Sequence, residues 1–273
     1  MVFKPQSGIR KCIWCGSTKR MEAEHIIGNW VRKVIKRNPH RTHLTVNWSK
    51  QTEKGMPDII AETVQGDAGT MTNPRVCWAC NHGWLRDLQD TAKPVIAPLM
   101  KGDWSDFGQD VVPAISNWML MTSITLSNMF AETLISQDTR SRFMSERSAW
   151  NRWAIFVGRM TGNQGVGYMQ RTAAVFDIFA NKEEQFEIVT LELGQLLIQA
   201  IYSPSLPASL DFFGGSVEYA HRLGIIPIFP QLGDGWIMLP FLREFDLLNA
   251  ANHIWLGGRN MYDRSGKLIT AFS

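Results

Sequence analysis

A chain of 273 residues with 45% hydrophobic and 19% charged residues is typical of a soluble globular protein, which excludes a largely disordered chain. Its net charge of +3 is unevenly distributed: residues 1–50 hold eleven Lys and Arg against two Glu, or +9, which leaves −6 for the rest. This asymmetry predicts a polyanionic partner at the basic end, the alternative being a solvated basic surface without a partner.

The N-terminus has no apolar segment of the kind that directs secretion, so we expect a cytoplasmic protein. The longest uncharged segment, residues 111–131, contains seven Ser, Thr and Asn side chains. That polar content predicts a helix buried within the protein and no membrane span.

The first part of the chain predicts a basic arm over 1–11, a cysteine knuckle over 12–17, a strand pair over 18–27 and a helix over 28–37. The helix has an apolar side and a basic side. Its basic residues are Arg32, Lys33, Lys36 and Arg37. Such a stripe is typical of a helix that binds nucleic-acid phosphates, and the alternative is a solvated amphipathic face.

The pattern is weaker in the middle of the chain, where we expect strands over 43–48 and 59–64 on either side of a polar linker. A helix is then predicted over 84–92, ended by Lys93-Pro94.

A change of composition near residue 105 indicates a domain boundary, because cysteine is absent beyond it and Met, Trp and Phe become frequent. We therefore divide the chain into domains over 1–104 and 105–273. The second domain is predicted to contain helices over 112–135, 139–148 and 242–253 and strands over 150–160 and 165–179. Residues 186–192 and 196–202 are either two further strands or a strand and a short helix. Short apolar runs follow over 225–230 and 236–240. The predicted fold class is α+β, a small zinc-binding domain followed by a domain of helices and antiparallel strands.

Tryptophan is abundant in the second domain, at Trp118, Trp150, Trp153, Trp236 and Trp255. Exposed tryptophans can form a stacking platform for single-stranded bases. Here their spacing with other apolar residues favours packing in a hydrophobic core.

All four cysteines of the chain lie in two CxxC pairs, Cys12/Cys15 and Cys77/Cys80. Each pair offers two sulfurs from one tight turn, and four thiolates are a complete ligand set for a tetrahedral structural zinc. Free thiols or a disulfide pair are the alternatives.

Polar residues suited to hydrolysis accompany the cysteines: Glu24-His25 lies between the pairs, and Asn81 follows the last cysteine. Imidazole can take a proton from water near neutral pH, and carboxylate or amide oxygens suit Mg²⁺ or Mn²⁺. Phosphodiester hydrolysis with a single metal requires these parts. The alternative is a structural zinc ribbon with an incidental histidine. His82 is a further candidate ligand, although a surface histidine is the simpler interpretation.

These motifs resemble the HNH nuclease family, whose ββα-metal motif is often held together by two CxxC knuckles; the resemblance covers roughly residues 8–100. It implies that His25 is the general base and that Asn73 orients it. It also implies that Glu24 and Asn81 bind a catalytic Mg²⁺ or Mn²⁺. The zinc would be structural and take no part in the reaction.

The pattern Glu-His-Ile-Ile-x-x-Trp, followed by Arg-x-Cys-x-x-Cys-Asn-x-Gly-Trp, is similar to bacterial and phage HNH proteins with a larger C-terminal domain. Two positions depart from that pattern. Gly28 stands where proline is common, and Gln89 stands where an acid is expected. Asp87 and Asp90 are nearby acids that could replace it.

The resemblance implies a metal-dependent HNH endonuclease that hydrolyses DNA, in a context of phage defence or mobile elements. A second hypothesis is a non-catalytic zinc-containing protein that binds nucleic acid. A third is that residues 105–273 carry the main function, as a sensor, a substrate-binding unit or an oligomerisation unit. That domain would then control the nuclease through a homo-oligomer or a regulatory partner.

Overall fold

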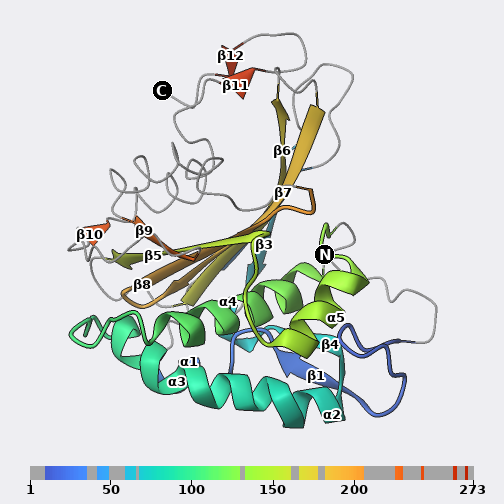
Figure 1. Ribbon diagram of the computed structural model, residues 1–273, viewed down its shortest axis with the longest axis vertical. Helices are drawn as coiled ribbons and strands as arrows, with labels where there is room; N and C mark the ends of the chain where they lie inside the picture. The colour runs from blue at the N-terminus through green and yellow to red at the C-terminus, as the bar shows by residue number, and fades with distance from the viewer. Residues whose placement is uncertain are drawn as a thin grey trace.

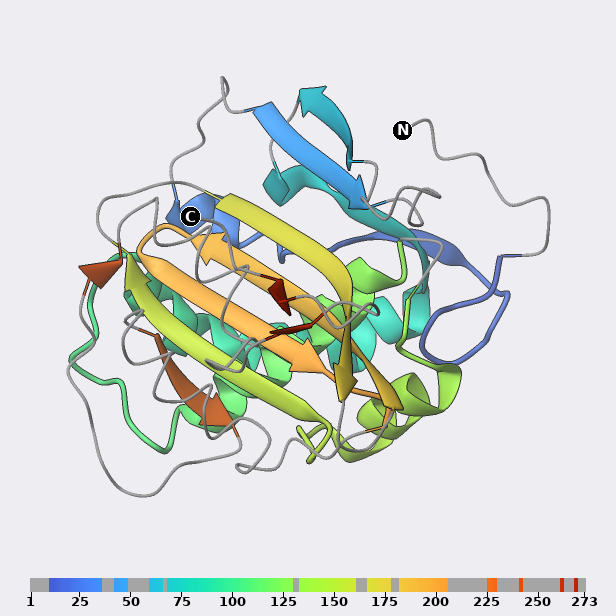
Figure 2. The same cartoon turned by 90° about the horizontal axis from the view of Figure 1, so that it is seen from above.

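The computed structural model describes residues 10–35, 42–48, 59–65, 68–129, 133–160, 166–177, 182–205, 225–229, 241–242, 261–262 and 268–269. In these residues the protein has helices packed on one face of a largely antiparallel sheet (Figure 1). Figure 2 shows the same sheet from above, with the helices behind it. The α+β fold class is therefore confirmed.

The strand β1 (Met21–His25) pairs antiparallel with β4 (Thr72–Cys77), which brings segments distant in the sequence together. The predicted strand pair over 18–27 is wrong, because residues 18–20 are not a strand. Arg20 has a left-handed φ of 43°, and its carbonyl oxygen accepts the Trp78 N–H at 2.8 Å. The turn before β1 is therefore tied to the second cysteine pair.

The chain between β1 and β4 begins with a short helix, α1 (Val31–Val34), and continues with two paired strands, β2 (Thr42–Trp48) and β3 (Ile59–Gln65). A short 3-10 helix, η1 (Ala68–Thr70), leads into β4. The two strands confirm the prediction over 43–48 and 59–64.

The predicted helix over 28–37 is too long, because α1 has only four residues. Ile35 is extended, with φ −102° and ψ 128°, and its side chain is buried. Burial of Ile35 in the core therefore ends the helix where the amphipathic pattern alone would continue it.

A helical segment begins within the second cysteine pair and comprises α2 (Trp78–Cys80), the π-helical turn η2 (Asn81–Leu85) and α3 (Arg86–Met100), with a kink at Gly83, where φ is −97° and ψ is −121°. The predicted end at Lys93-Pro94 is wrong, because α3 contains both Pro94 and Pro98. A proline inside a helix costs about 3 kcal/mol. Three buried side chains beyond Pro94 offset that cost, each contributing about 1.5–3 kcal/mol. They are Ile96, Leu99 and Met100.

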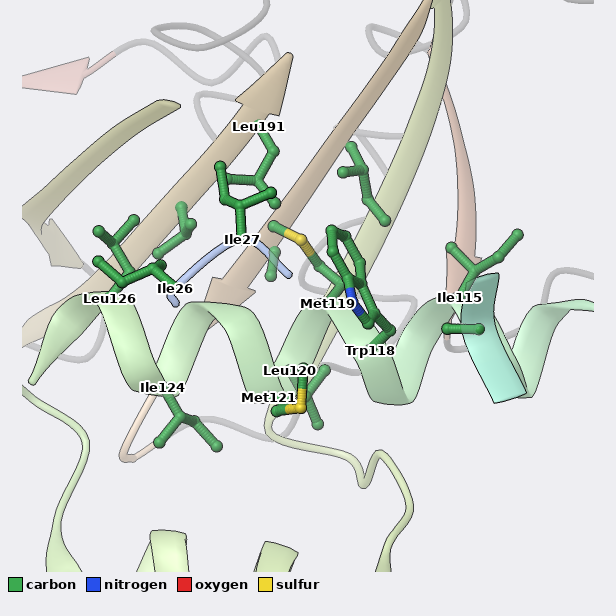
Figure 3. Close-up of a cluster of buried hydrophobic side chains, with 14 of the residues drawn as sticks. Ile26, Ile27, Ile115, Trp118, Met119, Leu120, Met121, Ile124, Leu126 and Leu191 are labelled. Atoms are coloured by element: carbon green, nitrogen blue, oxygen red, sulfur yellow. The ribbon is translucent and has the colours of Figure 1, made fainter. Parts of the chain in front are cut away.

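The helix α4 (Val112–Ser127) lies between the sheet and α3 (Figure 1). Its side chains are buried on opposite sides, as Leu126 and Ile124 show in Figure 3. The predicted continuation to Ile135 is wrong, because the Asn128 side chain donates back to the Ile124 carbonyl oxygen at 2.9 Å and closes the last turn. None of the helices described is long and apolar enough to cross a membrane.

The helix α5 (Gln137–Glu146) follows, shifted by two residues from the predicted range of 139–148. The Ser136 hydroxyl accepts the Thr139 N–H, and Arg147 ends the helix with a φ of 54°. A Ser N-cap and a left-handed residue after the last turn are common helix boundaries.

The large sheet has the order β10-β5-β8-β7-β6, and β9 also pairs with β5. Its strands are β5 (Trp153–Met160), β6 (Val166–Asp177), β7 (Lys182–Leu193), β8 (Leu196–Tyr202), β9 (Ile225–Phe229) and β10 (Phe241–Leu242). Only the β10–β5 pair is parallel among the pairs described. A separate pair joins β11 (Met261–Tyr262) to β12 (Leu268–Ile269). The predicted run over 236–240 and the predicted helix over 242–253 lie outside the described residues, except that Leu242 ends β10.

One hydrophobic core contains residues from both sides of the predicted domain boundary near residue 105. Trp14, in the first cysteine knuckle, has its ring 4.8 Å from Trp84 and 6.0 Å from Phe143 of α5. Trp118 and Trp153 are also buried, which confirms core packing for these residues. Division into two domains stays a prediction, but the two segments share buried side chains.

Candidate functional site

The four sulfurs of Cys12, Cys15, Cys77 and Cys80 lie within 4.8 Å of one another, and none is in a disulfide. Four thiolates at about 2.3 Å from a zinc ion are separated by about 3.8 Å, so the cluster has the size and ligand set for structural zinc. The cluster can therefore hold a metal such as zinc. No other group of three or more His, Cys, Asp or Glu side chains converges in this way within the described part of the chain.

The thiols of this cluster are close enough to share protons. Hydrogen bonding from Cys80 lowers the pKa of Cys12 to about 4, and the same contact, with burial, raises the pKa of the Cys80 thiol. Cysteine binds metal as the thiolate, and the lowered pKa of Cys12 favours the thiolate at that position.

Backbone geometry forms the first knuckle. Gly16 has a φ of 72°, its N–H donates to the Cys12 carbonyl oxygen at 3.0 Å, and the Cys12 N–H donates to Ser17 at 2.8 Å. Gly16 therefore lets the backbone fold back after the second sulfur, in a conformation that favours glycine. The Cys77 N–H donates to the Cys12 sulfur at 3.4 Å, which links the two knuckles directly.

The helix α5 holds the first knuckle in place. Arg140 Nε donates to the Ile13 carbonyl oxygen at 2.7 Å, and Gln137 Nε2 donates to the Trp14 carbonyl oxygen at 3.1 Å. Residues beyond position 105 thus position the metal cluster.

Glu24 is buried on β1, and its Oε1 accepts a hydrogen bond from Gln89 Nε2 of α3 at 3.0 Å. A Cβ atom at position 28 would collide with Gln89 Oε1. The two departures from the HNH pattern, Gly28 and Gln89, are therefore neighbours in space. Absence of a side chain at Gly28 makes room for the amide that contacts Glu24.

The surroundings of Glu24 disfavour its charged form. Burial raises the pKa of Glu24 to about 7, the negative charge of Glu22 adds to the increase, and the Gln89 hydrogen bond opposes both. A positive ion beside this carboxylate would favour its charged form.

His25 is the last residue of β1, where it pairs with Thr72 of β4 and is half-buried. Successive residues of a strand point to opposite faces, so His25 is directed away from the side on which Glu24 meets α3. Its imidazole has no hydrogen bond or ion pair to the residues that the structure describes.

Asn73 is fully buried on β4, where it pairs with Glu24. Its Nδ2 donates to the Thr125 carbonyl oxygen of α4 at 2.8 Å, and its Oδ1 accepts the Arg75 N–H at 2.9 Å. The register of β1 and β4 shifts between Glu22 and Glu24, which is a β-bulge beside these bonds. The amide of Asn73 thus holds the strand opposite Glu24 and is not bonded to His25.

Asn81 contacts a different acid from the one that the sequence suggests. Its Nδ2 donates to Glu22 Oε2 at 3.3 Å, and His82 Nδ1 lies 3.3 Å from the same oxygen. Sequence reasoning missed Glu22, although a Glu-x-Glu spacing on one strand places both carboxylates on one face. Glu22 therefore meets the start of the helical segment over 78–100, and Glu24 meets its next turns.

The two acids considered as replacements for Gln89 are both exposed. Asp90 forms an ion pair with Arg86 along the surface of α3, with 3.6 Å between Arg86 Nε and its Oδ2. Of Asp87, Gln89 and Asp90, Gln89 is the one hydrogen-bonded to Glu24.

The basic stripe is only partly described. Lys33 is exposed on α1, and Arg32 donates to Asn29 Oδ1 at 3.5 Å. Lys36 and Arg37 lie outside the described residues. Because α1 ends at Val34, the four residues do not form one continuous helical face.

Comparisons with known proteins give no relative: no family model, no curated protein and no solved structure matches this chain.

Proposed function

We propose that this protein is a metal-dependent HNH endonuclease that hydrolyses phosphodiester bonds of DNA. The observation that carries the proposal is the four-cysteine cluster, which joins the knuckle before β1 to the end of β4 and the start of the following helix. Glu24-His25 ends β1, and Asn81 lies in the helical turn after β4. A structural metal, an acid-histidine strand and a following helix are the parts that the resemblance requires.

In this proposal His25 is the general base, since its imidazole ends β1 without a partner among the described residues and an imidazole can take a proton from water near neutral pH. Asn73 positions His25 indirectly, by fixing the strand that pairs with β1. The zinc is structural.

Glu24 and Asn81 are the proposed ligands of Mg²⁺ or Mn²⁺, and their oxygens are the hard donors that these ions prefer. The ion would act as a Lewis acid on the phosphate. Glu22, already bonded to Asn81, adds a carboxylate on the same side of the strand. Each of the three side chains can offer an oxygen, so the donor set fits such an ion.

One observation favours the second hypothesis, a non-catalytic zinc protein that binds nucleic acid. The amide of Gln89 occupies one oxygen of Glu24, at the position where the family pattern has an acid. An amide adds no negative charge for a divalent ion, so the site is less charged than the pattern implies.

A plasmid-nicking experiment separates the two functions. The wild-type protein should convert supercoiled plasmid to the nicked form with Mg²⁺ or Mn²⁺, and His25→Ala should lose most of that activity, by about a hundredfold or more. Lys93→Ala, an exposed site on α3, is the control. Elemental analysis should find one zinc per chain in all three proteins.

Equal cleavage by wild type and His25→Ala would remove His25 from the chemistry. Absence of cleavage on duplex DNA, single-stranded DNA and RNA, together with salt-dependent binding, would instead establish the binding protein.

A further inference from the structure

An exposed tryptophan lies between the second pair of cysteines. Trp78 is 38% exposed, whereas Trp14, Trp118 and Trp153 are at most 1% exposed. It begins α2, and its N–H donates to the Arg20 carbonyl oxygen at 2.8 Å, so the backbone beneath the indole is fixed. The core does not require this ring, since much of it faces solvent.

One neighbour of the Trp78 ring is firmly held. The His82 ring is stacked on it, with 4.9 Å between centroids and 19° between planes. His82 Nδ1 lies 3.3 Å from both the Trp78 carbonyl oxygen and Glu22 Oε2. These contacts keep the imidazole against the indole and hold the indole in a defined orientation.

The second neighbour is loosely held. The Arg20 guanidinium lies 4.3 Å from the ring centroid, but its side chain is 67% exposed and its ion pair with Glu22 spans 3.9 Å. Ion pairs and cation–π contacts at such exposed positions contribute little. Arg20 can therefore leave the ring when a larger planar group competes for it.

We propose that Trp78 stacks on one unpaired nucleobase, which displaces the Arg20 guanidinium from the indole. The freed guanidinium then binds a phosphate of the same strand, as Arg commonly does. The inference rests on the proposed function in one respect, the nucleic-acid partner. Because a base in a duplex presents no free face, the site selects single-stranded or locally unpaired nucleic acid.

Binding of labelled oligonucleotides, followed by fluorescence anisotropy at one fixed salt concentration, tests this inference. The protein carries His25→Ala and no divalent ion is added, so cleavage does not affect the measurement. Trp78→Leu should weaken binding of a single strand about tenfold or more, while Trp78→Phe should stay within about threefold. Binding of a duplex of the same sequence should change by less than about twofold in both variants.

Arg20→Ala and Arg86→Ala form a matched pair, because each removes one exposed arginine from an ion pair with a carboxylate. Arg20→Ala should reduce the slope of the logarithm of the binding constant against the logarithm of the salt concentration by about one for a single strand, because one phosphate contact is lost. The preference for a single strand over a duplex should remain. Arg86→Ala should change neither quantity. Single strands of DNA and RNA serve as separate arms, since stacking on indole does not depend on the sugar.

Two results would overturn the inference: wild-type affinity of Trp78→Leu for a single strand, or an equal loss on single strand and duplex. Zinc content and thermal unfolding of Trp78→Leu and Trp78→Phe establish that both variants are folded. A protein that never cuts DNA but shows the Trp78 effect retains the stacking site without the nuclease. One that cuts through His25 but shows no Trp78 effect retains the nuclease without the stacking site.

Discussion

The cysteine cluster and the polar site beside it lie on the same two segments but are held by different interactions. In the cluster, four sulfurs converge within 4.8 Å and form a complete ligand set for a metal such as zinc. In the polar site, three side chains are bonded to neighbours that the motif does not specify. Glu24 bonds to Gln89, Asn81 to Glu22, and Asn73 to the backbone of Arg75 and Thr125.

This difference separates the interactions that bring the two segments together from those that set the charge of the polar site. The cysteine cluster joins the knuckle before β1 to the end of β4 and the start of the following helix. Local contacts then determine which acid meets which amide, and therefore the charge of the site. Substitutions in the cluster should affect the whole fold, whereas substitutions in the polar site should have smaller and more specific effects.

The largest expected effect is that of Cys77→Ser, which removes one sulfur from the buried cluster. Zinc should be lost, and with it much of a binding free energy of about 10 kcal/mol or more. Elemental analysis and thermal unfolding by circular dichroism measure both changes. Ser17→Ala, in the first knuckle but not at a metal ligand, should keep zinc. An unchanged melting temperature in zinc-free Cys77→Ser would show that metal does not hold the two segments together.

Asn73→Ala should have the next largest effect, a loss of about 2–4 kcal/mol in the free energy of unfolding. The substitution leaves the Thr125 carbonyl and the Arg75 N–H without their partner. Urea unfolding measures this loss, and zinc content should stay at the wild-type level. By contrast, His25→Ala should cost less than about 0.5 kcal/mol, because no described residue bonds to its imidazole. Equal destabilisation by the two variants would contradict the separate roles.

Stability should depend on pH through Glu24. Burial raises the pKa of Glu24 from its ordinary value of 4.5 to about 7. Between these values the folded protein binds more protons than the unfolded chain, so its free energy of unfolding falls as the pH rises, by up to about 3 kcal/mol. The neutral variant Glu24→Gln should lack this fall. Urea unfolding at pH 5 and pH 8 tests it, and identical slopes for both proteins would assign the pH dependence to other groups.

The sequence predicts those parts of the molecule that depend on local pattern. The strands over 43–48 and 59–64 lie where predicted, because alternating apolar residues mark them. For 196–202, where the pattern allowed a strand or a short helix, the structure has the strand. Helix ends are less predictable, since burial decides them: Ile35 ends α1 early, and buried residues carry α3 past Pro94.

The candidate site, like the helix ends, is only partly predictable from the sequence. Cysteine spacing predicts the four-sulfur cluster, because each pair comes from one turn and four thiolates form one ligand set. It does not predict that Asn81 meets Glu22 while Glu24 meets Gln89. Those pairings depend on the register of β1 against β4 and on the helical turn from which each amide projects, and both are set by tertiary packing.

The smallest expected effect concerns the contact between Gly28 and Gln89. Gly28→Ala places a methyl group where Gln89 Oε1 lies, so it should displace the amide from Glu24 and cost about 1–2 kcal/mol. Gln89→Ala removes the same hydrogen bond and should cost a similar amount. Both substitutions break the hydrogen bond from Gln89 to Glu24, although the new methyl group also meets the Trp30 ring. The double variant should therefore be less destabilised than the two losses added together, by about 1 kcal/mol. Urea unfolding of the four proteins measures that coupling. Strictly additive losses would mean that Gly28 does not act through the Gln89 amide, and that the two departures from the HNH pattern are independent.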